Sequence, residues 1–237
     1  MYNGFYVLFN NETSLDIGIK VVSRPDIPSP QPIFKEYDVP GKPGKEYELE
    51  GYEDIEIPVS FNFVDKEDMH ERFRKCKKWI NNIKDNKLIF SDNRGIFYRV
   101  NYAKITSNER VMKVIGKFTV TFNCEPFAYE MEGQHEITVN NEAIIYNDGD
   151  LESKPIIKIK GEGLVTIVIN GETIKANVGQ NIIIDSYLDI SYKEDKTSQN
   201  NNVKCKKYPQ LKIGENTVSY SGGRVDSFII IPNWIIY

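Results

Sequence analysis

The chain has 237 residues, a formal net charge of −4, and 40% hydrophobic and 27% charged residues, which is typical of a folded globular protein and excludes a mainly disordered one. The acidic balance argues against nucleic-acid binding, since a phosphate backbone is bound by displacing its counterions with Lys and Arg. No stretch approaches the roughly 20 apolar residues of a membrane-spanning helix, and no basic leader opens the chain. The three cysteines are odd in number and widely spaced, so we expect Cys76 and Cys124 to be buried thiols.

The first quarter of the chain predicts strands and then an arm. Apolar residues alternate over 5–9 and again over 15–21, with Asn10 and Asn11 between them, which predicts a hairpin. Residues 24–44 are rich in Pro and Gly, and no helix or central strand could hold them. We expect a projecting or wrapping loop there, with a plain surface connection as the alternative.

One helix is expected, over about residues 65–84. A strand over 55–63 precedes it, and Asp65 is placed to begin the helix. Its apolar stripe is made of residues spaced by three and four, with Trp79 beside it: Met69, Phe73, Cys76, Ile80 and Ile83. The opposite face carries five basic residues, among them Arg72, Lys75 and Lys78.

Two interpretations of this basic face stay open. A run of charge on a short amphipathic helix is most often a solvated surface. The sharper hypothesis is that it faces the acidic segment of a neighbouring subunit, where charge complementarity would set the register of the contact. The candidate interface residues are then Arg72, Lys75, Lys78, Glu48, Glu50 and Glu53.

The segment 117–127 predicts the last strand of a first domain. Phe118, Val120 and Phe122 alternate with polar residues, as in a strand with one buried face. Pro126 cannot donate to a ladder, so regular pairing should end near Cys124 and Glu125. We therefore predict a first domain over 1–130 and a second over 134–237. The expected hinge consists of Cys124, Glu125, Pro126 and Phe127.

The second domain is predicted to be a β-sandwich or jelly roll. Short apolar segments recur about every ten residues with turn residues between them, including separate strands over 156–159 and 164–169. Asn170 and Gly171 tolerate positive φ and form the clearest hairpin turn. Trp234 and the apolar end of the chain should pack on a sheet edge.

The sequence contains no pattern typical of an enzyme. The chain has only two His residues, which is too few to favour a Ser-His-Asp triad or a metal site built from histidines. We also expect no cofactor. A carbohydrate-binding second domain is the alternative function, because sandwich lectins use exposed aromatics. The available tyrosines are Tyr187, Tyr192, Tyr208 and Tyr220, although no polar ligands accompany them at one spacing.

The order of several short motifs resembles the distal tail proteins of siphophages. In the first half these are 24–28, the turn 39–41, the Trp79 helix followed by 88–92, and 122–127. In the second half they are 147–149, 155–157, 161–163, 184–186, 209–211 and 214–216. Each motif is short, and the resemblance rests on their order and spacing over nearly the whole chain.

That resemblance implies a structural virion protein that is not an enzyme. Its fold would be mainly β with one helix: an N-terminal β-sandwich or split barrel plus the helix, and a C-terminal galectin-like sandwich. The first domain would form a hexameric ring at the tail tip or baseplate, assembled in the host cytoplasm. The implied partners are the tail tube protein, the tail-associated lysin or fibre protein and, in some phages, receptor-binding proteins.

Overall fold

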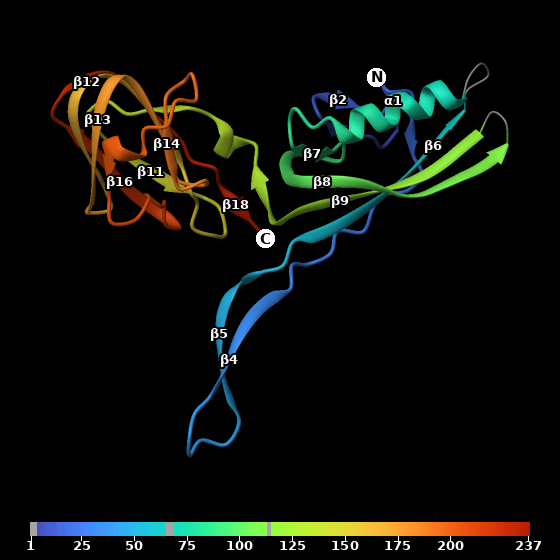
Figure 1. Ribbon diagram of the computed structural model, residues 1–237, viewed down its shortest axis with the longest axis horizontal. Helices are drawn as coiled ribbons and strands as arrows, with labels where there is room; N and C mark the ends of the chain where they lie inside the picture. The colour runs from blue at the N-terminus through green and yellow to red at the C-terminus, as the bar shows by residue number, and fades with distance from the viewer. Residues whose placement is uncertain (1–3, 65–68, 113–114) are drawn as a thin grey trace. The chain divides into compact units, whose positions relative to one another are not determined.

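The structure, a computed structural model, describes residues 4–64, 69–112 and 115–237. It divides into two compact units, Met1–Ala128 and Tyr129–Tyr237 (Figure 1). Within the described ranges there are many strands, two short 3-10 helices and one α-helix. The predicted fold class, mainly β with a single α-helix, is confirmed. No helix among the described residues is both long enough and apolar enough to cross a membrane.

The first unit is built on one antiparallel sheet. Its strands in spatial order are β2, β1, β7, β8, β9, β6 and β3, while β4 and β5 form a separate two-stranded ribbon. The bounds of the elements are β1 Val7–Phe9, β2 Glu12–Thr13, β3 Lys20–Val21, β4 Pro32–Asp38, β5 Lys45–Tyr52, β6 Ile55–Val64, α1 Met69–Asn81, β7 Lys87–Phe90, β8 Asn93–Met112 and β9 Ile115–Glu130.

Strand β9 lies between β8 and β6 in this sheet and has the one buried face that its alternation predicts. Phe118, Val120 and Phe122 are fully buried, because every second side chain of the strand points to the same face. The pairing of β9 with β6 ends with Ile55 opposite Cys124, as expected before Pro126. The strand itself continues to Glu130, so its last two residues belong to the second unit.

Helix α1 covers the aromatic face of the sheet. Trp79 is buried and meets the rings of Phe9 and Phe61 edge-on at 5.8 and 6.2 Å. Phe73 meets Phe118 in the same manner at 5.5 Å. The Trp79 indole N–H donates to the carbonyl of Phe9 at 2.8 Å, which satisfies its one polar group inside the core.

The helix ends earlier than its pattern predicts, at Asn81 rather than near 84. The cause is Asn10, which lies far away in sequence. Its Nδ2 donates to the carbonyls of Trp79 and Asn82 at 3.0 and 2.6 Å, and its Oδ1 accepts from the N–H groups of Lys84 and Asp85. These bonds satisfy carbonyls that a helix end leaves unpaired. The predicted start at Asp65 lies outside the described residues.

Two predictions in the first unit need correction. The expected strand over 15–21 is mostly a turn, because the Asp16 carboxylate accepts from the N–H and hydroxyl of Thr13 at 3.1 and 2.6 Å. Only Lys20–Val21 pairs, and it pairs with β6 instead of closing the predicted hairpin. The proline-rich arm is also partly regular, since Pro32–Asp38 forms β4.

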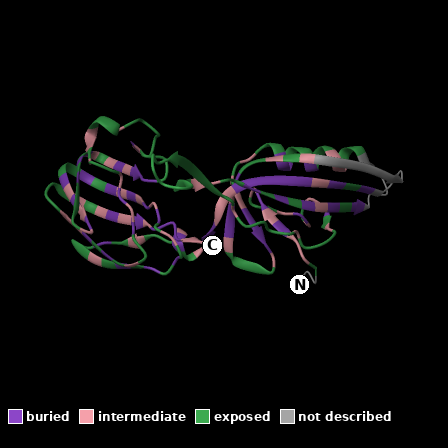
Figure 2. Cartoon of the chain, turned by 90° about the horizontal axis from the view of Figure 1, so that it is seen from below, coloured by how far each residue is buried: buried purple, intermediate pink, exposed green. Residues whose placement is uncertain are grey.

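The second unit has its own core, separate from that of the first, and buried residues alternate along its strands (Figure 2). One path of its sheet runs β10, β17, β12, β13, β14, and β16 joins β11 to β12. The bounds are η1 Glu132–Gln134, β10 Ile137–Thr138, β11 Glu142–Asn147, β12 Ile156–Ile169, β13 Glu172–Asp185, β14 Ile190–Tyr192, η2 Asn200–Asn202, β15 Val203–Lys204, β16 Gly214–Ser221, β17 Arg224–Ile231 and β18 Ile235–Ile236.

Several details of this unit follow the sequence. Asn170 and Gly171 both have positive φ, 52° and 84°, and join β12 to β13 in a tight hairpin. Trp234 is buried, and its carbonyl accepts from the N–H of Glu130, so the apolar end of the chain packs as expected. Asp185 closes the turn after β13 by accepting from the N–H groups of Tyr187 and Leu188.

The strands predicted over 156–159 and 164–169 form one bent strand. The register between β12 and β17 shifts between Lys160 and Gly161, which marks a bulge. Gly161 is required there, since a Cβ on it would lie 2.0 Å from the carbonyl oxygen of Arg224. The Gly-Glu-Gly sequence therefore bends a continuous strand instead of separating two.

Replacing Gly161 with Ala should lower the free energy of unfolding of the second unit by about 1–3 kcal/mol, because the added methyl overlaps backbone on the neighbouring strand. Gly179→Ala is the matched control, since Gly179 lies across from Glu162 in β13 and its Cβ would meet nothing within 4 Å. Denaturant unfolding followed by circular dichroism measures both. Equal midpoints for the two variants would contradict the bulge argument.

Candidate interaction surfaces

The cysteines of the first unit are core side chains. Cys76 and Cys124 are both fully buried. Burial raises the pKa of the Cys76 thiol to about 12 and raises that of Cys124 above its ordinary range as well. Both thiols therefore stay protonated at neutral pH and are unreactive. Among the described residues, no three His, Cys, Asp or Glu side chains are grouped to hold a metal ion.

The predicted basic residues of the helix line one wall of an open cavity of about 390 Å³. Arg72, Lys75 and Lys78 all contribute to it, and Glu12 and Asp16 line it too. The helix positions the three cations on one side because they are spaced by three residues. The structure thus brings together the basic half of the predicted interface.

Arg72 differs from the two lysines because the fold already uses it. Its side chain is half-buried, and Nη1 donates to the carbonyl of Ile17 at 2.9 Å. The guanidinium lies against Gly18, where a Cβ would be 2.3 Å from Nη1. Arg72 therefore fixes the turn before β3, whereas Lys75 and Lys78 are exposed, with Lys75 only 3.5 Å from Glu71 on its own helix.

The predicted acidic residues lie on the β4–β5 ribbon or at its base. Glu48 and Glu50 are exposed on β5, and Glu48 accepts from the Tyr37 hydroxyl at 2.6 Å across the ribbon. Glu53 follows the ribbon, and its N–H donates to the carbonyl of Gln31 at 2.9 Å. In this single chain none of the three forms an ion pair with the described residues of the helix.

The ribbon has a second face that the sequence analysis missed. Register places Phe34 opposite Leu49 and Glu36 opposite Tyr47, so these side chains share one face. Phe34, Tyr47 and Leu49 are 51%, 61% and 49% exposed, and the two aromatic rings meet edge-on at 6.2 Å. We call Phe34, Tyr47 and Leu49 the ribbon apolar face. The signal was the alternation of Tyr47 and Leu49 with glutamates.

The ribbon extends from the sheet as two paired strands without a core of its own (Figure 1). No residue of β4 is buried, and only the last two of β5 are half-buried. An isolated two-stranded hairpin is marginally stable in water. A ribbon of this length with an exposed apolar face is therefore a candidate contact surface.

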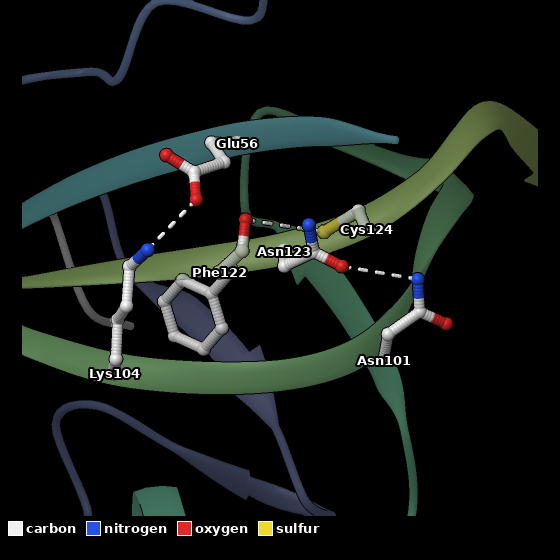
Figure 3. Close-up of polar contacts among 6 residues, drawn as sticks. All are labelled: Glu56, Asn101, Lys104, Phe122, Asn123 and Cys124. Atoms are coloured by element: carbon white, nitrogen blue, oxygen red, sulfur yellow. Dashed lines mark hydrogen bonds and ion pairs between the residues drawn. The ribbon is translucent and has the colours of Figure 1, made fainter. Parts of the chain in front are cut away.

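The sheet face opposite the helix is polar and cross-linked by side chains. Figure 3 shows Lys104 of β8 reaching Glu56 of β6, with Nζ 2.8 Å from the carboxylate. Asn101 of β8 donates to Asn123 of β9 at 3.1 Å and to Asp54 at 3.0 Å. These contacts fasten three neighbouring strands on the side of the sheet away from the helix.

The predicted hinge residues lie in the last part of β9. Cys124 is buried, and Glu125, Pro126 and Phe127 are half-buried. The ring of Phe127 meets that of Tyr52 edge-on at 4.8 Å, which holds this end of the strand to the base of the ribbon. Whether a hinge operates here stays a prediction.

A comparison with protein families assigns the first unit. Residues 12–124 match the model of the phage tail protein RIFT-related domain, and they include the ribbon, the helix and most of the sheet. Over these residues the chain is similar to a domain of phage tail proteins, and the resemblance to the siphophage distal tail proteins is confirmed. No match was found among curated proteins.

Solved structures share the fold over both units. The Dit protein of phage SPP1, described as a paradigm of the hub adsorption apparatus in phages infecting Gram-positive bacteria, is similar with a TM-score of 0.58 and 15% identity, over 95% of this chain and 97% of that one. A chain of the phage P2 baseplate in its activated conformation with calcium is similar with a TM-score of 0.53 and 10% identity, over 97% and 98%. The fold is thus that of phage tail hub and baseplate proteins.

Proposed function

We propose that this protein is the distal tail hub of a phage virion, in which six first units close a ring. The second unit, a galectin-like sandwich, points outward and docks peripheral proteins. The ring joins the tail tube protein to the tail-associated lysin or fibre protein, and in some arrangements to receptor-binding proteins. The role is structural and not enzymatic. The location is the tail tip, after assembly in the host cytoplasm.

The observation that carries the proposal is the exposed ribbon. A ring closes through a heterologous interface, so every copy needs two different matching patches. The ribbon apolar face supplies one patch, because three large and half-exposed apolar side chains on an unsupported hairpin gain stability when a partner covers them. The other strand positions of β5 present Glu46, Glu48 and Glu50; Glu46 is paired with Lys42, so Glu48 and Glu50 are the carboxylates that this side of the ribbon offers to a partner.

The basic wall of the helix cavity complements that acidic side. In this arrangement the ribbon of one copy reaches the next copy, and its glutamates meet Lys75 and Lys78 there. Charge pairs of this kind at an exposed rim contribute mainly to orientation and association rate. The apolar face contributes most of the affinity. The segment Cys124–Phe127 then links the ring to the outward unit.

Light scattering and negative-stain imaging of the protein mixed with its tail tube and lysin or fibre partners test the hub. The expected result is a closed ring of about six copies, as the family resemblance indicates. The isolated protein need not assemble, because the partners can nucleate the ring. Protein that stays monomeric with both partners present would overturn the proposal.

Reversing two helix charges, Lys75→Glu with Lys78→Glu, should raise the protein concentration required for ring closure about tenfold. The reason is that two attractive charge pairs at the rim of the interface become repulsive. Circular dichroism should show an unchanged fold, since both side chains are exposed. The control is Lys175→Glu with Lys204→Glu, an equal charge change on exposed residues of the second unit. If both double variants assemble equally, the helix face is a solvated surface.

A further inference from the structure

Two cavities flank the loop segment 206–210 of the second unit. The larger is about 520 Å³ and the smaller about 260 Å³. Both are lined by Lys207, Tyr208 and Gln210, so the loop forms a shared wall between them. Together they have the size of an ordinary small-molecule site.

The smaller cavity is lined by Ser186, whose buried hydroxyl lacks a hydrogen-bond partner among the described residues. Ser186 is 1% exposed, and its Oγ has no partner among the described residues. Buried hydroxyls in native proteins are normally paired with protein atoms or ordered water, so an unpaired one on the wall of a cavity marks a position for a ligand atom. Lys154 and Lys207 line the same cavity, together with Asp189. Two cations and a hydroxyl donor around one small space suit an oxyanion.

The larger cavity joins an apolar floor to a charged rim. Ile169, Ile174 and Pro209 form buried parts of its lining, beside the ring of Tyr208. The rim carries Lys206 and Lys212 but also carboxylates and amides: Glu152, Glu172, Asn170 and Gln210. Such carboxylates and amides accept hydrogen bonds from hydroxyl groups, and the apolar floor with a tyrosine suits the C–H face of a sugar ring.

Interactions within the unit hold the shared wall in place. The Tyr208 hydroxyl lies 3.1 Å from Oγ of buried Ser191. Lys207 Nζ donates to Gln210 Oε1 at 2.6 Å. The backbones of Leu211 and Ser153 exchange two hydrogen bonds of 2.9 Å. The site is therefore formed before any ligand arrives, which limits the ordering cost of binding.

We propose that the two cavities form one binding site for a phosphorylated saccharide. The phosphate lies between Lys154 and Lys207 with Ser186 Oγ donating to it, and the sugar occupies the larger cavity against Tyr208. Lysines alone would suit any anion, and carboxylates alone a neutral sugar. The combination favours a ligand that has both phosphate and hydroxyl groups.

Among the four tyrosines that the sequence offers for carbohydrate binding, only Tyr208 lines these two cavities. Tyr192 donates to the Asp185 carboxylate at 3.2 Å, and Tyr220 stacks on Phe228 with ring centroids 4.7 Å apart. This activity is independent of ring closure and would add recognition of a glycan to a structural hub.

Titration of the full-length protein, followed by amide NMR shifts, tests the site with glucose 1-phosphate, N-acetylglucosamine 1-phosphate, the two unphosphorylated sugars and inorganic phosphate. At least one sugar phosphate should bind tenfold or more tightly than its parent sugar and than inorganic phosphate. If a parent sugar binds as tightly as its phosphate, the lysines do not bind the phosphate group. If inorganic phosphate binds as tightly as the sugar phosphates, the larger cavity does not bind the sugar. Absence of saturable binding by both sugar phosphates would overturn the site.

Variants assign the binding to these cavities. Lys154→Ala with Lys207→Ala should weaken binding of the sugar phosphate at least tenfold, and Ser186→Ala several-fold. Ser186→Ala should not destabilise the fold, since it removes a hydroxyl without a partner. Lys175→Ala, an exposed lysine that lines neither cavity, is the control. Binding that is unchanged in the double variant would place the ligand elsewhere and leave the hub function intact.

Discussion

Replacing Trp79 with Ala should lower the free energy of unfolding of the first unit by about 3–5 kcal/mol, the range found for removing a large aromatic side chain from a core. Trp79 fixes helix α1 to the sheet, because its ring lies between those of Phe9 and Phe61 and its indole N–H donates to the carbonyl of Phe9. Its removal leaves a cavity and an unpaired buried carbonyl at the same point.

The two tryptophans make this measurement specific, because Trp79 lies in the first unit and Trp234 in the second. In the Trp79→Ala variant, fluorescence reports the second unit, while circular dichroism reports both. The unfolding transition of the first unit, seen by circular dichroism, should move to a lower denaturant concentration. The transition of the second unit, seen by Trp234 fluorescence, should not move. Trp79→Phe is the control, and losing mainly the hydrogen bond should cost about 1–2 kcal/mol. Similar losses in the two variants would show that ring packing contributes little.

The fold could be predicted where one local pattern settles the outcome. The alternation of Phe118, Val120 and Phe122 gave a buried strand, and the spacing of Phe73, Cys76 and Ile80 gave the helix and its inner face. In each case the period of apolar residues matches the geometry of the element that buries them. The Asn170–Gly171 turn was equally local, since both residues tolerate positive φ.

The fold could not be predicted where a polar side chain overrides the apolar pattern, or where a side chain far away in the sequence decides. Leu15, Ile17, Ile19 and Val21 alternate as a strand would, but the Asp16 carboxylate bonds to Thr13 and turns the chain. The end of the helix depends on Asn10, which caps it from across the unit. Apolar periodicity does not register the first contact, and the sequence around the helix contains no information on the second.

The candidate surfaces divide in the same way. Charge patterning found Lys75 and Lys78, and they do share one cavity wall. It missed the ribbon apolar face, because Tyr47 and Leu49 acquire their neighbour Phe34 only when β4 and β5 pair across the turn. The second-unit cavities were beyond sequence reasoning altogether, since Lys154, Ser186 and Lys207 come from three separate loops.

Substituting the ribbon apolar face, Phe34→Ser with Tyr47→Ser and Leu49→Ser, should abolish ring assembly while leaving both units folded. The three side chains are about half exposed in the single chain, so serine costs little intramolecular packing. If Phe34 and Tyr47 are anchors of the interface, each truncation lowers the binding free energy of that interface by about 2 kcal/mol or more. A loss of about 4 kcal/mol weakens each interface by roughly a thousandfold.

A matched control separates assembly from a general loss of apolar surface. Ile144→Ser, Tyr146→Ser and Leu164→Ser remove similar side chains that are 67%, 61% and 55% exposed on the second unit. Imaging with the tail tube partner should show rings for this control and for the unaltered protein, but none for the ribbon variant. Normal rings from the ribbon variant would mean that the apolar face meets a different partner. Loss of rings in both variants would place the second unit in the ring contact as well.

Charge reversal at Lys75 and Lys78 should only weaken ring closure, whereas the serine substitutions on the ribbon should abolish it. The difference between these two sets of variants measures how much more apolar burial contributes to the ring than charge.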